Sequence, residues 1–157
     1  MTTIYTLLKQ DHDKHRDLLS QIQDSNNPQE KNELWQRFYH DVKGHAAAEE
    51  ETFYAKLMSF SEGQPKARHS VAEHKEADDL LEATIALDVS DPQWVSQFKT
   101  LKHDYEHHIE EEETEIFPQA KKVFSTPLAE QLGERFASRK PEEIKIAAQK
   151  EKAKLSV

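Results

Sequence analysis

Apolar residues recur every three or four positions along four long stretches of this chain, which is the spacing of one face of an α-helix. The four faces are residues 4–22, 34–53, 71–85 and 94–116. Short clusters of turn-forming residues separate them, at 24–28, 59–65 and 88–92. Because no stretch alternates with the period of a strand, the pattern predicts an all-α protein. Its four helices, joined by short connections, are expected to pack as an antiparallel up-down-up-down bundle.

The pattern weakens at the C-terminal end of the fourth stretch. Pro118 lacks an N–H and is expected to kink or end that helix. A short C-terminal helix that covers one end of the bundle is predicted by Phe124, Leu128, Leu132 and Phe136. From residue 138 the chain is rich in Lys, Glu and Ala and has almost no apolar stripe. We therefore expect one bundle domain over residues 1–137 and a charged helical or disordered tail over residues 138–157.

Composition narrows the classes of function. The formal net charge of -9 over 157 residues opposes binding to nucleic acid or to an anionic membrane, since both need a basic face. The absence of cysteine excludes disulfides, thiol catalysis and iron–sulfur clusters, and 3 glycines are too few for a P-loop or a dinucleotide-binding loop. With neither an apolar run of membrane-spanning length nor a signal peptide, we expect a cytoplasmic protein, as a monomer or weak homodimer.

Histidines and carboxylates interrupt the middle of each apolar face, where a purely structural helix would carry leucine. Burial of an unpaired imidazole or carboxylate costs several kcal/mol or neutralises the group. Four helices that accept this cost at one level indicate a shared partner, and a metal ion is the simplest one. A hydrogen-bonded core histidine is the alternative for any single position, but a poor one for four histidines in register with two glutamates.

The strongest signal is a motif that occurs twice. His45 and His108 each begin the pattern His-x-x-x-Glu-Glu, which places the imidazole and the first carboxylate, Glu49 or Glu112, on one helix face. The other two faces carry an acid followed by a histidine, in Asp11-His12 and Glu73-His74. The histidines of the first pair of stretches are 33 residues apart, and those of the second pair 34. The chain thus repeats one helix pair with one set of candidate ligands.

These residues form the candidate ligand set. The six main candidates are His12, His45, Glu49, His74, His108 and Glu112. Three further residues are possible additional ligands, namely His15, Glu73 and Asp78. Imidazole and carboxylate without thiolate suit iron, manganese or zinc, whereas structural zinc usually takes four ligands that often include cysteine. We expect two iron ions bridged by two carboxylates, with manganese or zinc as the alternatives.

The chain resembles the hemerythrin-like (HHE cation-binding) domain family from Ile4 to about Phe117. The resemblance rests on four segments, 7–12, 45–54, 73–74 and 107–118, which carry the motifs above in the family's order. It implies a four-helix bundle over residues 1–137 that holds a non-haem di-iron centre. Transferred position by position, it implies that the terminal ligands are His12, His45, His74 and His108. The bridging carboxylates would be Glu49 and Glu112.

The third helix departs from the pattern of the oxygen-carrying hemerythrins, which have a His-x-x-x-His pair there. This chain has Ser70 one turn before His74, so one histidine is missing, and its second bridge is a glutamate instead of an aspartate. His15 would supply a fifth imidazole, or Glu73 or Asp78 an oxygen. The departure argues against simple reversible oxygen carriage, because ligand number and charge set the potential of the iron.

Three functions fit these residues. The first is a protein that binds or senses O2, nitric oxide or peroxide at a carboxylate-bridged iron pair. The second is an oxidoreductase on the same centre, of the peroxidase, catalase-like or ferroxidase type. The third is a metal-free helical interaction module that uses its acidic faces. Metal content separates the third function from the others, and turnover with peroxide separates the second from the first.

Overall fold

The computed structural model describes residues 2–155, and within this range it contains helices and no strand. The prediction of an all-α protein is therefore confirmed. The five long helices are α1 (Ile4–Asp24), α2 (Pro28–Glu49), α4 (Gln64–Ile85), α5 (Pro92–Glu111) and α7 (Thr126–Leu155). The shorter elements are the π-helical turns η1 (Glu50–Tyr54) and η3 (Glu112–Ile116), the 3-10 turn η2 (Ser61–Gly63), α3 (Ala55–Met58) and α6 (Phe117–Val123). None of the described helices is both long and apolar enough to cross a bilayer.

The starts of three long helices follow ordinary capping chemistry. Thr3, Asn27 and Asp91 have extended backbones, and each accepts a hydrogen bond from a backbone N–H of the first helical turn. Pro28 and Pro92 then occupy the first helical position, where the missing N–H costs nothing. The sequence signals for the starts of α1, α2 and α5 are thus local ones.

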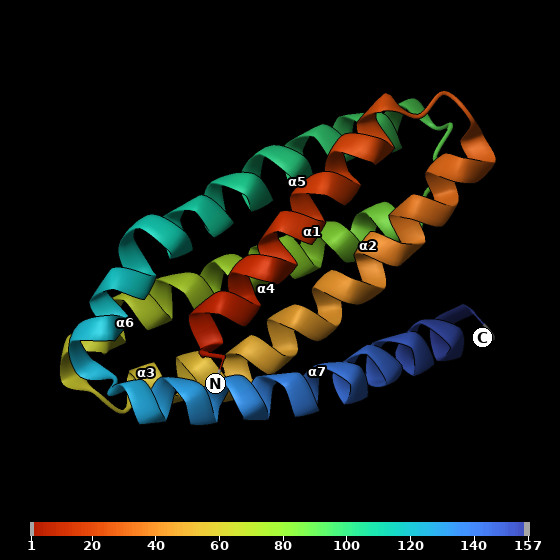
Figure 1. Cartoon of the computed structure of the whole chain (residues 1–157). Helices are drawn as coiled ribbons and strands as arrows, with labels where there is room; N and C mark the ends of the chain where they lie inside the picture. Colours follow the sequence, from red (N-terminus) through yellow and green to blue (C-terminus); the bar gives the residue numbers. More distant parts are fainter. Residues whose placement is uncertain (1, 156–157) are drawn as a thin grey trace.

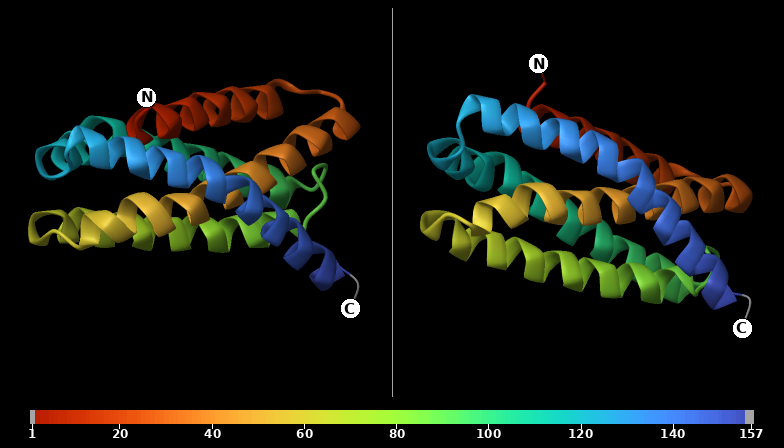
Figure 2. Two further views of the ribbon diagram at one scale, coloured as in Figure 1. Left: turned by 60° about the horizontal axis from the view of Figure 1, so that its bottom comes forward. Right: turned by 90° about the horizontal axis from the view of Figure 1, so that it is seen from below.

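The long helices lie alongside one another and enclose two apolar cores. Figures 1 and 2 show α1, α2, α4 and α5 side by side, with α7 running along α2 and α1. One core gathers around Trp35, Trp94 and Phe98, and the other around Phe53 and Phe117. In each of the four helices the histidines and glutamates of the candidate ligand set lie between the residues of these two cores. The cores therefore hold the polar layer at a common depth.

The C-terminal region differs from the expected short helix followed by a tail. α7 is one helix of 30 residues that continues through Pro141. From Arg139 onward it has few apolar residues and is held against the rest of the molecule by polar contacts, including the ion pairs Arg139–Glu51 and Lys140–Asp41. As far as residue 155, the segment expected as a charged helical or disordered tail is thus a continuation of this helix, and its polar contacts leave no apolar stripe in the sequence.

Pro118 does not end the fourth helical segment. The π-helical turn η3 precedes it, and Pro118 then lies in the first turn of α6, which ends at Val123. A proline is tolerated in a first turn because the N–H it lacks would have no intrahelical partner there.

Candidate metal centre

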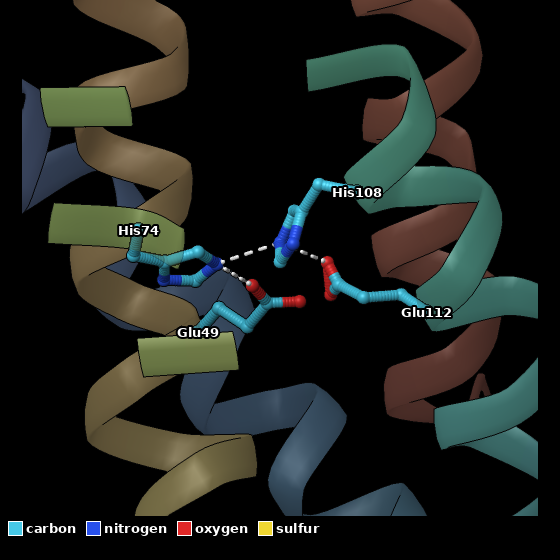
Figure 3. A group of neighbouring side chains, drawn as sticks. All are labelled: Glu49, His74, His108 and Glu112. Carbon is cyan, nitrogen blue, oxygen red and sulfur yellow. Dashed lines mark hydrogen bonds and ion pairs between the residues drawn. The ribbon is translucent and has the colours of Figure 1, made fainter. Parts of the chain in front are cut away.

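The six main candidate ligands converge in the layer between the two cores. They are His12 on α1, His45 and Glu49 on α2, His74 on α4, His108 on α5 and Glu112 at the start of η3. His12, Glu49 and Glu112 have no exposed surface, and the other three are nearly buried. Figure 3 shows how Glu49, His74, His108 and Glu112 point toward one another, with His108 and Glu112 on one continuous helical segment.

Four of these residues form a compact set of ligand atoms, which we name the His74 group: Glu49, His74, His108 and Glu112. The Nε2 atom of His74 lies 3.1 Å from Glu49 Oε1 and 3.1 Å from the Nε2 atom of His108. The latter atom lies 3.1 Å from Glu112 Oε1. Two imidazole nitrogens and two carboxylate oxygens thus face one small volume, as the ligands of a single cation do.

A second set, the His12 group, consists of His12, His45 and Glu49. The Nε2 atom of His45 lies 3.9 Å from Glu49 Oε1, and that of His12 lies 3.6 Å from Glu112 Oε1. Each glutamate therefore lies between an imidazole of one group and an imidazole of the other. This is the placement of a carboxylate that bridges two ions.

Four polar atoms at the centre form no hydrogen bond, although imidazole nitrogens lie 3.1 to 3.9 Å from the carboxylate oxygens. Both carboxylate oxygens of Glu49, Oε1 of Glu112 and Nε2 of His12 are buried without a partner. Buried polar atoms are almost always satisfied, and an unsatisfied buried charge is costly. Metal coordination satisfies carboxylate oxygens and imidazole nitrogens together, so the residues present fit a pair of cations.

The second nitrogen of each imidazole, Nδ1, is bonded to a carboxylate of a neighbouring helix. The four pairs are His45–Asp11 (2.7 Å), His74–Glu50 (3.0 Å), His108–Glu73 (2.9 Å) and His12–Glu113 (2.7 Å). They form a closed ring through α1, α2, α4, α5 and η3. Donation from Nδ1 fixes the tautomer and leaves the Nε2 lone pair directed at the centre, as in other metal-bound histidines.

Burial and neighbouring charges shift the pKa values of the central residues in opposite directions. Burial and the nearby Glu112 raise the pKa of Glu49 well above its usual range. Burial would also raise the pKa of Glu112, but the His108 imidazole lowers it instead. Burial would lower the pKa of His108, yet the Glu112 and Glu73 carboxylates raise it to about 9. His45 differs, because burial prevails and lowers its pKa to about 4. Without a cation, the two buried glutamates thus depend on a proton and on His108 for compensation.

Both bridging-position glutamates lie where an α-helix widens into a π-helical turn. α2 ends at Glu49 and η1 follows it directly, while Glu112 is the first residue of η3. π-helical turns are rare and occur frequently at functional sites. The repeated His-x-x-x-Glu-Glu motif therefore corresponds to a repeated local distortion, which the helical periodicity did not indicate.

The three additional candidates lie outside the central layer of ligand atoms. His15 is buried, but its Nδ1 accepts from the Tyr105 hydroxyl at 2.6 Å and its Nε2 donates to Asp41 at 2.6 Å, so neither nitrogen is free for a metal. Glu73 bonds His108, as described above, and Asp78 is half exposed and paired with Lys43.

Sequence reasoning missed the roles of Asp11, Glu50, Glu113 and Asp41. The first three directly flank a candidate ligand in the sequence, and each bonds the histidine of a different helix. Adjacency to a ligand was thus a usable signal. The role of Asp41 had no such signal, since it depends on how α1 and α2 pack.

A cavity of ≈ 880 Å³ connects part of the centre with the surface. It lies between α2, α4, α5 and the second half of α7. His45, His74, His108 and Glu112 contribute to its lining, and Ile146 of α7 lies at its outer wall with 38% of its surface exposed. The cavity gives a small molecule a path to the candidate ligands.

Comparisons with known proteins agree with this geometry. The sequence profile described as Hemerythrin HHE cation binding domain matches residues 3–120. A curated relative from Nostoc sp. (strain PCC 7120), named DNA nickase, is 30% identical over 137 residues, which are 87% of this chain but 39% of that protein. The chain thus spans less than half of that relative. A crystal structure of a hemerythrin HHE cation-binding domain-containing protein from Mycobacterium kansasii has a TM-score of 0.83 at 24% identity, over 96% of this chain and 92% of the other, and shows the same fold.

Proposed function

The chain belongs to the hemerythrin HHE cation-binding family, as its motifs indicated, and from this premise we propose that it holds two iron ions and binds O2, nitric oxide or peroxide there. In this proposal α1, α2, α4 and α5 act as the family's antiparallel four-helix bundle, and α7 is added to it. The terminal ligands are His12, His45, His74 and His108, and the bridges are Glu49 and Glu112.

One observation carries the proposal. The buried oxygens of Glu49, Glu112 Oε1 and His12 Nε2 have no hydrogen-bond partner. In a metal-free interaction module, nothing would offset the free-energy cost of burying these polar atoms. A cation pair satisfies all of them and neutralises the two glutamates.

The chain's own residues perform four tasks in this function. The Nδ1–carboxylate ring orients the imidazoles, and the apolar cores on either side exclude bulk water. Tyr54 donates a hydrogen bond to Glu112 Oε2 at 3.0 Å and so fixes the plane of that carboxylate. The cavity admits the small ligand. When bound, the ferrous pair would supply the electrons and an open coordination position for that ligand.

Metal content tests the proposal directly. Protein prepared anaerobically with ferrous iron is expected to retain about two irons per chain after desalting, as the ligand groups imply. The apoprotein is expected to melt at a lower temperature, because a ligand that binds only the folded state stabilises it. Less than one iron per chain, with no effect of a chelator on the melting temperature, would favour the interaction module instead.

An oxidoreductase of the peroxidase, catalase-like or ferroxidase type is the second candidate. The observation that favours it is the cavity, which is far larger than a diatomic molecule and reaches His74, His108 and Glu112. Stopped-flow mixing with excess hydrogen peroxide distinguishes the two. Several turnovers per iron pair indicate an enzyme, whereas one stoichiometric reaction indicates a binding or sensing protein.

The name of the Nostoc relative does not lead us to propose nucleic acid as a partner. The net charge of -9 opposes contact with a phosphate backbone, and most of that relative lies outside the aligned region. We propose a cytoplasmic protein that acts as a monomer or weak homodimer. A gel-shift titration at low salt and sedimentation at several protein concentrations test the partner and the assembly.

A further inference from the structure

Helix α7 begins after the last residue of the matched family region, yet it lies against the metal-facing part of α2. Gly44, the residue before His45, makes this approach possible. A Cβ at Gly44 would lie 3.1 Å from the backbone N of Ile144 and 3.2 Å from the carbonyl O of Lys140. These distances are tighter than ordinary contacts, so the absence of a side chain at Gly44 sets the distance between α7 and α2.

Lys140 reaches from α7 to two carboxylates at the closest approach of these helices. Its Nζ atom lies 2.9 Å from Asp11 Oδ2 and 3.1 Å from Asp41. The Lys140 side chain is 14% exposed and that of Asp11 15%, so solvent screens this pair less than a surface pair. Burial would raise the pKa of Asp11, but hydrogen bonds from His45 and Lys140 lower it to about 2.

Both carboxylates hold a buried imidazole. Asp11 Oδ2, the oxygen that Lys140 contacts, also accepts from Nδ1 of His45 at 2.7 Å. Asp41 Oδ2 accepts from Nε2 of His15 at 2.6 Å. α7 adds a second contact to the same ring, since Phe136 packs edge-on against His45 with 5.6 Å between the ring centroids. One helix thus fixes His45 both through its hydrogen-bond acceptor and by direct packing.

We propose that Lys140 is a positioning residue for the metal ion of the His12 group. Its ammonium group holds Asp11 in the plane that accepts from His45 Nδ1, so that the Nε2 lone pair points at Glu49. Without this charge, Asp11 is free to turn toward solvent, and His45 loses the partner that selects its tautomer. The inference rests on the proposed two-metal function and adds a segment outside residues 3–120 to the metal site.

Cobalt(II) titration, followed by the visible absorption of the bound ion, tests this inference in the full chain. Two parent variants separate the positions: His74→Gln leaves the His12 group intact, and His12→Gln leaves the His74 group intact. Lys140→Met is expected to weaken cobalt binding about 10- to 100-fold in the His74→Gln parent, as is typical for loss of such a partner. In the His12→Gln parent the change is expected to stay within about twofold.

Three controls make the result specific. Lys140→Arg keeps the charge and is expected to restore binding. Lys145→Met removes a lysine of α7 that is 69% exposed and paired with Glu142, and it is expected to change nothing. Lys140→Gln replaces Lys140→Met if the latter melts well below its parent without metal.

The outcomes also separate this inference from the proposed function. Unchanged or stronger binding in the Lys140→Met, His74→Gln protein overturns the role of Lys140, and equal weakening in both parents shows a general structural effect and overturns it too. Failure of the unsubstituted chain to bind two cobalt ions overturns the proposed function itself.

Discussion

The two halves of the centre contain the same kinds of ligands but hold them differently. In the His12 group the carboxylates that accept from Nδ1 are each paired with a basic side chain, Glu113 with Arg16 at 3.0 Å and Asp11 with Lys140 at 2.9 Å. In the His74 group, Glu50 has no lysine or arginine within ion-pair distance among the side chains described for residues 2–153, and Glu73 has His69, at 3.3 Å, besides His108. The first half is therefore backed by permanent positive charge and the second is not.

The histidines of the His74 group are also more exposed than those of the His12 group. The side chains of His12 and His45 are 0% and 2% exposed, whereas those of His74 and His108 are 9% and 7% exposed. His74 and His108 both line the cavity, whereas in the His12 group His45 does and His12 does not. A pseudo-repeated sequence has thus produced one rigidly supported half and one half that is closer to solvent. The contrast indicates that repeated motifs fix which atoms meet, while the surrounding residues decide how firmly each atom is held.

Glu49 belongs to both groups, so its replacement is expected to have the largest effect. Glu49→Gln keeps the shape but removes the charge and one coordinating oxygen from both positions. We expect the iron content to fall from about two per chain to below about 0.2, with affinity lowered more than 100-fold, since loss of an outer partner alone typically costs roughly 10- to 100-fold. The apoprotein is expected to melt at a higher temperature than the unsubstituted apoprotein, because the burial of the Glu49 carboxylate is costly without a metal ion.

Glu51→Gln is the matched control for this change. Glu51 lies two residues later, is about half exposed and pairs with Arg139 at the surface. Its iron content should stay at about two per chain. Retention of two irons by Glu49→Gln would show that Glu49 bridges nothing and would remove the link between the two halves.

Removal of one imidazole from either half is the next largest change. His12→Gln and His74→Gln are each expected to lower the tightly bound metal from about two ions per chain to about one, as measured by elemental analysis after desalting. His103→Gln is the control, because His103 is 84% exposed and lies outside the centre. Complete loss of metal in both variants would show that the two positions bind only as a unit, and the comparison of separate halves would fail.

The sequence predicted most of the centre because helical periodicity places residues on faces. His45 and Glu49, or His108 and Glu112, share a face at any packing angle, and turn clusters delimit the helices that bring them together. The Nδ1–carboxylate ring could have been predicted in part, since Asp11, Glu50, Glu73 and Glu113 each adjoin a candidate ligand.

Other features could not be read from periodicity. The packing of α7 depends on the missing side chain of Gly44 and on the Lys140 ion pairs, which are contacts between residues about 100 to 130 positions apart. The π-helical turn that follows Glu49 likewise has no signature in the spacing of apolar residues. The role proposed for His15 as a fifth ligand depended on its face alone, and Tyr105 and Asp41, which bond both of its nitrogens, come from other helices.

The different support of the two halves predicts unequal responses to loss of their Nδ1 partners. Glu113→Gln removes the carboxylate that joins His12 to Arg16, whereas Glu50→Gln removes an acid that is 39% exposed. We expect cobalt affinity to fall about 30-fold for Glu113→Gln, within the roughly 10- to 100-fold range for such partners, and only about threefold for the more exposed Glu50→Gln, below that range. Isothermal titration of each apoprotein with cobalt(II) measures both. Equal losses would mean that the positive charge of Arg16 does not distinguish the halves.

The cavity predicts the smallest effect, on the rate of ligand entry and not on metal binding. Ile146 lies at the outer wall and exposes 38% of its surface, so a larger side chain can fill the space without disturbing a core. Ile146→Trp is expected to slow azide binding to the oxidised iron-loaded protein about two- to fivefold, while iron content stays at two, because the path narrows but the ligands do not move. Ile146→Leu keeps the side-chain volume and should leave the rate of azide binding unchanged. This control separates the effect of side-chain size from that of any substitution at this position. If azide binds at the same rate to Ile146→Trp as to the unsubstituted protein, the small ligand reaches the iron by another route, and the greater exposure of His74 and His108 has no part in access.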